Sequence, residues 1–156
     1  MHIEEFKRAV GKFPTGVSVI TTSKDGNLYG FTASSFVSVS LAPPLVSFCL
    51  DKYANSFPAF EACEFFSVSI LADDQENLAK HFSHRLEDKF IGVKHHILLK
   101  SNTPIVDNCA SYLECRQYKK LECGDHFIFV GEVISTIVDE TKSPLLYYAK
   151  SFKSIL

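Results

Sequence analysis

The sequence predicts a mainly β protein, a barrel or sandwich with short helical insertions. The extended runs are many and short, the candidate helices are few and short, and strands do not alternate with helices as in a doubly wound sheet. In addition, the stretch from Gly26 to Leu50 carries no charged residue but is rich in hydroxyls. A membrane span would not place Pro43-Pro44 and Thr32-Ala33-Ser34-Ser35 where every backbone group needs a partner. Two buried strands beside a polar ligand fit the stretch better.

Length and composition predict one domain over residues 1–156. The chain has 14 Phe, no Trp and 22% charged residues, which is typical of a globular core. The net charge of −2, with Lys119-Lys120 as the densest basic pair, argues against nucleic-acid binding. The start of the chain, Met1-His2-Ile3-Glu4-Glu5, lacks the basic and apolar regions of a secretory signal, so we expect a cytoplasmic protein with no membrane partner.

Five cysteines are odd in number and contain no Cys-x-x-Cys pair. They therefore indicate neither a disulfide framework nor a zinc ribbon, and free thiols are expected. The residues are Cys49, Cys63, Cys109, Cys115 and Cys123.

The first elements follow from periodicity. Ile3, Phe6, Val10 and Phe13 recur at helical spacing, and Phe13-Pro14-Thr15-Gly16 ends this helix and leads into a strand. Strands 17–22 and 28–31 are separated by Lys24-Asp25-Gly26-Asn27, which is turn chemistry and predicts a hairpin.

Two further strands are predicted over 36–41 and 45–50. Alternation in the first places Val37, Val39 and Leu41 on one side, which we assign to the barrel core. Phe36, Ser38 and Ser40 fall on the opposite side.

The remaining elements are read in the same way. Asn55-Ser56 is expected to cap a helix through about residue 63, and Asp73 or Asp74 to cap one over 75–82 with Leu78 and Phe82 inward. The region 84–101 has a weak pattern, a helical turn at Leu86, Phe90 and Ile91 and a strand over 97–99. Strands are predicted over 65–71, 111–121, 127–138 and 145–148.

Several familiar sites are not supported. No Gly-x-Gly-x-x-Gly follows a strand, Gly11-Lys12-Phe13 lacks the spacing of a P-loop, and there is no Gly-x-Ser-x-Gly. His81, His84 and His95-His96 could suggest a metal, but no His-Glu-x-x-His occurs, so we expect none. Gly124-Asp125-His126 places a carboxylate beside an imidazole before an aromatic strand, although the same residues suit an ordinary turn.

Taken together, the motifs resemble the short-chain flavin reductases of the FMN-binding split-barrel superfamily, which include the reductase components of two-component flavin monooxygenases. The resemblance covers nearly the whole chain, and the order and spacing of the motifs carry it. They are Phe13-Pro14-Thr15-Gly16-Val17, Thr32-Ala33-Ser34-Ser35-Phe36, Ser38-Val39-Ser40, Pro43-Pro44-Leu45, Gly124-Asp125-His126 and Pro144-Leu145-Leu146-Tyr147-Tyr148.

The resemblance implies a Greek-key split barrel that forms a homodimer, binds FMN or FAD near the subunit interface and takes hydride from NADH or NADPH. By position, Thr32, Ala33, Ser34 and Ser35 would line the isoalloxazine and part of the ribityl chain, followed by Cys49 and Leu50. Asn55 and Ser56 would meet the ribityl phosphate, with Lys89 a further phosphate candidate. Asp125, His126 and Tyr148 would lie on the nicotinamide side, with His126 as the catalytic positioning residue.

Physical chemistry agrees with these assignments. An uncharged wall of amides and hydroxyls suits the isoalloxazine edge, and free N–H groups at the start of a helix suit a phosphate without a basic residue. Hydride transfer between nicotinamide and flavin requires no protein acid, so the protein must mainly position the two rings.

Two departures from the family pattern bear on the pyridine-nucleotide preference. Val68-Ser69-Ile70-Leu71 has a serine where many relatives have an amide, and Ala149-Lys150-Ser151-Phe152 replaces an Arg-Gly pair followed by an aromatic residue. Both are expected near the flavin or nicotinamide.

Three functions remain open at this point. The first is an NAD(P)H:flavin oxidoreductase, which could supply reduced flavin to a monooxygenase. The second is an FMN-binding electron carrier or flavin store, and the third is an FMN-containing reductase of a non-flavin acceptor such as a ferric chelate. The sequence does not distinguish FMN from FAD or NADH from NADPH.

Overall fold

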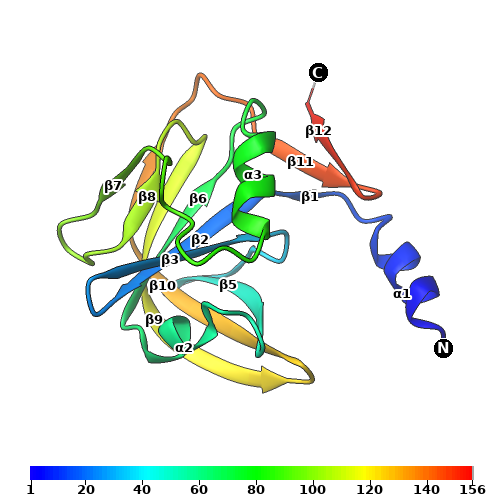
Figure 1. Cartoon of the computed structure of the whole chain (residues 1–156), viewed down its shortest axis with the longest axis horizontal. Helices are drawn as coiled ribbons and strands as arrows, with labels where there is room; N and C mark the ends of the chain where they lie inside the picture. Colours follow the sequence, from blue (N-terminus) through cyan, green and yellow to red (C-terminus); the bar gives the residue numbers. More distant parts are fainter. Residues whose placement is uncertain (156) are drawn as a thin grey trace.

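A computed structural model describes residues 1–155 and confirms a mainly β architecture built on antiparallel strands. Seven strands form the main sheet in the order β3-β2-β6-β9-β10-β5-β4 (Figure 1). Their bounds are β2 Ser18–Lys24, β3 Asn27–Ala33, β4 Val37–Leu41, β5 Pro44–Asp51, β6 Phe65–Ile70, β9 Ser111–Cys123 and β10 His126–Val138.

Two small sheets and three helices complete the part of the chain that the structure describes. A three-stranded sheet joins β1 to β11 and β12, and a two-stranded sheet joins β7 to β8. The strands are β1 Thr15–Gly16, β7 His95–Ile97, β8 Pro104–Val106, β11 Leu145–Tyr148 and β12 Ser151–Ser154. The helices are α1 Ile3–Val10, α2 Phe57–Ala62 and α3 Glu76–Ser83.

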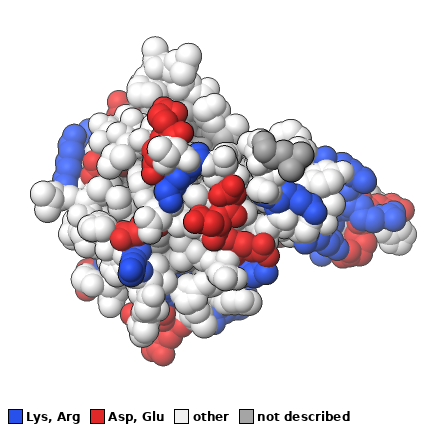
Figure 2. Space-filling view, turned by 90° about the horizontal axis from the view of Figure 1, so that it is seen from above, with Lys and Arg blue, Asp and Glu red and all other residues white. Residues whose placement is uncertain are grey.

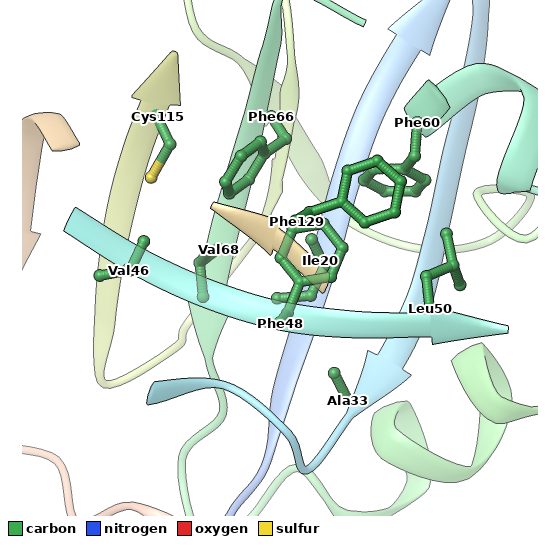
Figure 3. Packing of buried hydrophobic residues seen from close by; sticks show 10 residues of the cluster. All are labelled: Ile20, Ala33, Val46, Phe48, Leu50, Phe60, Phe66, Val68, Cys115 and Phe129. Carbon is green, nitrogen blue, oxygen red and sulfur yellow. The ribbon is translucent and has the colours of Figure 1, made fainter. Parts of the chain in front are cut away.

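The main sheet curls around a phenylalanine-rich core, and a second buried cluster lies between the barrel and α3. Side chains from β2, β3, β5, β6, β9, β10 and α2 all belong to the same buried cluster (Figure 3). Phe48 stacks on Phe129 with ring centroids 5.1 Å apart and meets Phe66 edge-on at 5.0 Å. A Cβ at Gly131 would lie 2.3 Å from the Phe66 ring, so only glycine fits there. Strands near both ends of the sheet thus share one interior.

Most predicted elements are confirmed, including the N-terminal helix and the β2–β3 hairpin. Asp25 and Gly26 both have positive φ in its turn, at 52° and 79°. Such a turn follows the twist of the two strands it joins.

The predicted caps and the region after α3 need correction. The structure gives neither Ser56 nor Gln75, the N-cap residues of α2 and α3, a side-chain capping bond. Asp73 and Asp74 precede the α3 N-cap and do not form it. The expected helical turn over 86–91 is wrong, β7 lies at 95–97 instead of 97–99, and sequence reasoning missed β8 and β12.

The predicted core face of β4 is also wrong. Val37, Val39 and Leu41 are 54%, 53% and 92% exposed, whereas Phe36 packs against the barrel core. Strand β4 lies at the edge of the sheet and, within residues 1–155, pairs with β5 alone, with an irregularity between Ser38 and Ser40. The opposite face of β4 carries Ser38 and Ser40, with Phe36 just before the strand, so the rule that the apolar face of a strand points inward fails here.

Candidate functional site

A cleft of about 620 Å³ lies between the ends of β3 and β5, the start of α2 and the loop after α3; we call it the first cleft. It gathers nine residues that the sequence assigned to a flavin together with His126. These are Thr32, Ala33, Ser34, Ser35, Cys49, Leu50, Asn55, Ser56, Lys89 and His126. The volume lies within the range of pockets that hold small ligands, roughly 300–1,000 Å³.

The strand wall of the first cleft, Thr32–Ser35 with Cys49–Asp51, is fixed from behind. Ala33 and Leu50 are buried in the barrel core. The Thr32 hydroxyl donates to the Ala79 carbonyl at 2.6 Å, and the Ser35 Oγ accepts from the Cys49 N–H at 2.9 Å. Ser34 is exposed, so its hydroxyl is available to a ligand.

The loop side of the first cleft, residues 84–89, brings charge to the site. His84, Arg85, Glu87 and Lys89 all line the cleft. The sequence identified only Lys89 of these, because the loop has neither periodicity nor a motif that would indicate which side chains face a ligand. The cleft therefore offers a phosphate two cations in addition to Asn55 and Ser56.

Lys89 also has a partner within the protein. Its Nζ donates to the Phe82 carbonyl at the end of α3, at 2.8 Å, and its own carbonyl lies 2.7 Å from His81 Nε2. Burial lowers the pKa of the Lys89 ammonium. The side chain thus ties the loop to α3 from a position on the cleft lining.

The turn between β9 and β10 places His126 at the mouth of the first cleft. His126 pairs across the sheet with Asp51, and Gly124 takes the positive φ that the turn requires. The His126 Nδ1 lies 2.7 Å from Asp125 Oδ1, and this hydrogen bond and the nearby imidazole lower the pKa of the Asp125 carboxyl. The contact engages Nδ1 and leaves Nε2 for a ligand.

Two of the predicted site residues lie outside the first cleft. Asp125 is exposed and does not line the cleft, but it contacts His126, which does. Tyr148 lies on β11 and does not line the cleft either. The neighbouring Tyr147 lines a second cleft of about 470 Å³, which shares Thr32, Ala33, Ser34 and Ser83 with the first.

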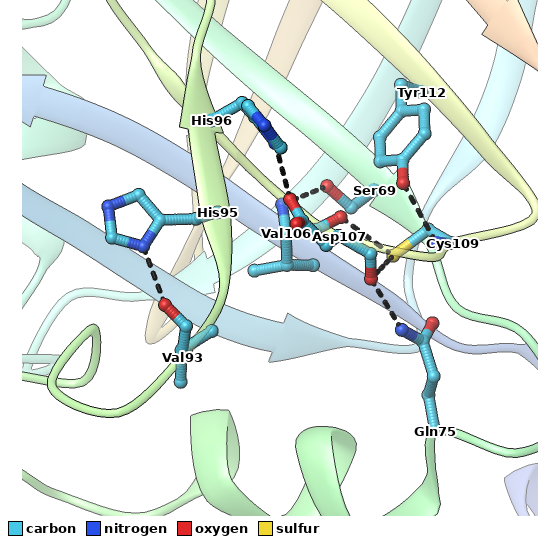
Figure 4. A network of polar contacts seen from close by, with 9 residues as sticks. All are labelled: Ser69, Gln75, Val93, His95, His96, Val106, Asp107, Cys109 and Tyr112. Atoms are coloured by element: carbon cyan, nitrogen blue, oxygen red, sulfur yellow. Dashed lines mark hydrogen bonds and ion pairs between the residues drawn. The ribbon is translucent and has the colours of Figure 1, made fainter.

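The two departures from the family pattern lie in different places. Lys150, Ser151 and Phe152 line the second cleft, next to the shared strand wall. Ser69 is fully buried, and its Oγ accepts from the Val106 N–H at 3.3 Å (Figure 4). The expectation that Ser69 lies near a cofactor is wrong, because its hydroxyl holds β8 against the barrel.

The histidines considered for a metal have other partners. His95 contacts the Val93 carbonyl, and His96 contacts the Asp107 carboxylate (Figure 4). Within residues 1–155, no group of three or more metal-binding side chains comes together. In the same part of the chain, no helix is long and apolar enough to cross a membrane.

The cysteines are free, as predicted. Burial raises the pKa of the Cys63 thiol to about 11 and that of Cys109 and Cys115 to about 12, so these three stay protonated and unreactive. Cys49 alone among the five lines the first cleft.

Comparison with known proteins assigns this arrangement to a family. The model of the flavin reductase like domain matches residues 10–156. The chain belongs to this family. It is 37% identical over 144 residues to a flavin reductase of Pseudomonas putida, covering 92% of this chain and 84% of the relative. It is also 39% identical over 148 residues to the actinorhodin polyketide dimerase of Streptomyces coelicolor, covering 94% and 83%.

A solved member of the family has the same architecture. The NADH:FAD oxidoreductase SgcE6 of Streptomyces globisporus, solved with NAD and FAD fragments, superposes with a TM-score of 0.94 at 36% identity. The match covers 98% of this chain and 92% of that one. The split barrel expected from the sequence is therefore confirmed as the fold class.

Proposed function

We propose that this protein is an NAD(P)H-dependent flavin reductase that transfers hydride from a reduced nicotinamide to FMN or FAD. The observation that carries the proposal is the first cleft itself. It combines an uncharged wall at Thr32–Ser35, cations at Arg85 and Lys89, and an imidazole at His126. Membership of the flavin reductase family and the likeness to an NADH:FAD oxidoreductase support the same chemistry.

The donor set of the first cleft fits a flavin. Backbone amides and hydroxyls of the strand wall match the hydrogen-bonding edge of an isoalloxazine. The first charged side chain of that wall is Asp51, at its far end after Leu50. Asn55, Ser56, Arg85 and Lys89 would bind the phosphate. When bound, the flavin supplies the hydride-accepting N5 atom.

The work of the chain is to orient the two rings. Ser35 is fixed by its bond to the Cys49 amide, so the wall that would hold the flavin has little freedom. His126 would donate from Nε2 to the nicotinamide carboxamide or a nearby phosphate, because Asp125 occupies Nδ1. Tyr148 remains a proposed contact of the nicotinamide, although it lies outside the first cleft.

The activity is tested by adding NADH and then NADPH to the protein with FMN, and again with FAD, while the oxidised-flavin absorbance at about 450 nm is followed. Bleaching with at least one pair is expected. No bleaching with any pair would contradict the proposal and favour an electron carrier or flavin store. Flavin retained through dialysis, with turnover only when a ferric chelate is added, would favour the non-flavin acceptor.

The role of His126 has its own test. His126→Ala should raise the KM for the nicotinamide while the flavin dissociation constant stays nearly unchanged, because the imidazole would contact the co-substrate. Steady-state kinetics and a flavin titration measure the two quantities. An unchanged KM would contradict the role.

The setting of the reaction is also a proposal. We propose that residues 1–156 act as one flavin-binding domain, that two copies form a homodimer, and that diffusible reduced flavin reaches a monooxygenase. Names of relatives such as the reductase component of a 4-nitrophenol monooxygenase from Rhodococcus opacus support the last point. Free cysteines support a reducing, cytoplasmic location.

A further inference from the structure

Helix α1 stands clear of the barrel. Figure 1 shows it projecting from the end of the molecule that carries β11 and β12, and none of its residues is buried. Its base is tied to the β11–β12 turn by a bond from the Ala149 N–H to the Gly11 carbonyl. We call residues 3–13 the arm.

The arm has too few contacts of its own to be a stable helix. An isolated helix of eight residues is marginal in water, and most helices in proteins are held by packing of an apolar face. His2, the N-cap residue, makes no side-chain capping bond, and the exposed Glu4–Lys7 pair adds little. The arm nevertheless carries an apolar stripe, Ile3, Phe6, Val10 and Phe13, whose side chains are 47–73% exposed. Such a stripe requires a partner surface.

The same chain offers a second uncovered apolar surface. Val37, Val39 and Leu41 of the edge strand β4 are all more than half exposed, and no charged residue lies between Gly26 and Leu50 to protect them. Val39 is an extra residue in the pairing with β5, and Pro43 and Pro44 follow the strand. This irregular edge is poorly suited to the addition of another strand, so side-chain packing against a helix suits it better.

The combined area suits a second copy of the chain. The seven apolar side chains of the arm and β4 expose roughly 800 Å² in total, about what each partner contributes to a standard stable interface. A two-fold symmetric pair would use both surfaces twice, because each arm meets the other copy's strand. Figure 2 shows Lys and Arg gathered over the projecting end, where Lys7, Arg8 and Lys12 would stay in water when the apolar stripe is covered.

We propose that two copies exchange arms, so that α1 of each packs on Val37, Val39 and Leu41 of the other. This inference rests on the homodimer of the proposed function but specifies which surfaces meet. Each arm then gains the packing that it lacks in one chain, and each exposed β4 edge is covered.

Complementary charges test the pairing in full-length protein. Phe6→Lys would place an ammonium of the arm against the apolar side chains of β4 in the other copy. Val39→Glu would place a carboxylate of β4 against the apolar stripe of the other copy's arm. Both positions are about half exposed, so each variant should fold. Analytical ultracentrifugation should show a dimer for the wild type and at least about a tenfold weaker dimer for each variant.

Mixing the two variants should restore the dimer. The heterodimer has one Lys–Glu contact and one unaltered contact between arm and strand, whereas each homodimer has two damaged contacts. The matched control is Leu99→Glu, in the loop between β7 and β8 on the far side of the barrel from α1 (Figure 1). It should itself dimerise normally, and mixed with Phe6→Lys it should give a weaker heterodimer than Val39→Glu does, because one of the two contacts stays damaged.

The outcomes separate this inference from the proposed function. A monomeric wild type, variants that dimerise normally, or a mixture that stays monomeric would each overturn the arm exchange. In the second case the homodimer itself stands, with another interface. The bleaching assay on the wild type is scored independently, so failure to reduce flavin overturns the proposed activity and leaves the arm exchange intact.

Discussion

The strand wall and the loop side of the first cleft differ in what holds them. The strand wall continues directly into the barrel core through Ala33, Phe48 and Leu50, all 5% exposed or less. The loop side has exposed residues at 84–88 and is held mainly by bonds of His81 and Lys89 to backbone carbonyls. A ligand would thus meet one wall fixed by apolar packing and one fixed by a few polar contacts. Substitutions on the two sides should separate global stability from ligand affinity.

The largest expected effect is a loss of unfolding free energy when the packing behind the strand wall is disrupted. Phe48→Ala removes a fully buried ring that contacts Phe31, Phe60, Phe66 and Phe129, and should lower the free energy of unfolding by about 3–5 kcal/mol. Denaturant unfolding measures the change. Leu99→Ala, at a fully exposed position, is the control and should change it by less than about 0.5 kcal/mol. Similar losses in both variants would contradict this packing.

The loop side should respond in affinity rather than in global stability. Lys89→Met removes the charged bond to the Phe82 carbonyl and should weaken FMN binding about tenfold, with a change in unfolding free energy below about 1 kcal/mol. Lys89→Arg keeps the cation and should retain most of the affinity.

Riboflavin, which lacks the phosphate, distinguishes the two roles of Lys89. If FMN and riboflavin lose affinity equally, Lys89 acts by positioning the loop. A larger loss for FMN indicates direct contact with the phosphate. No loss for either ligand would mean that the loop side does not contribute to the site.

A smaller loss of flavin affinity is expected on removal of the Ser35 hydroxyl, which joins the segment after β3 to β5. Ser35→Ala leaves the Cys49 amide without its 2.9 Å acceptor and should cost about 0.5–1.5 kcal/mol of flavin affinity, measured by titration. Ser38→Ala, an exposed serine of β4 outside the cleft, is the matched control and should bind flavin normally. Equal affinities of the two variants would argue against this part of the wall.

The smallest effect is expected on the KM for NADH, when the exposed Asp125–His126 pair is broken. The pKa of Asp125 is lowered by His126, so the bonded carboxylate is present above that lowered pKa and is lost as pH falls through it. Asp125→Asn should raise the KM for NADH by only about twofold, because the pair is open to solvent. A carboxyl titration followed by NMR should show the pKa of Asp125 returning toward its usual range in His126→Ala; no change would exclude the contact in solution.

The strand wall was largely predictable and the loop side was not. Thr32–Ser35 span the end of β3 and the two residues after it, and Cys49–Leu50 lie on β5. The apolar spacing and flanking turns of both strands are local signals. Arg85 and His84 lie in a segment without periodicity, whose course depends on bonds between His81, Phe82 and Lys89. Those contacts require α3 to lie against the barrel, next to β3. The assignment of Ser69 failed for a similar reason, since β8, its actual partner, was not predicted.

The sequence by itself determined the strands of the main sheet, the hairpin turns, the motif order that assigns the family and the uncharged composition of the strand wall from Thr32 to Leu50. These depend on local backbone preference and on residue type, both of which are present in a short stretch of chain. Only the tertiary structure decided which face of β4 is inside, which loop residues reach the cleft and where Tyr148 lies. Each of these depends on packing between segments distant in sequence. The spacing of apolar residues along a strand is the same whether their side chains face the barrel core or lie on the outer surface.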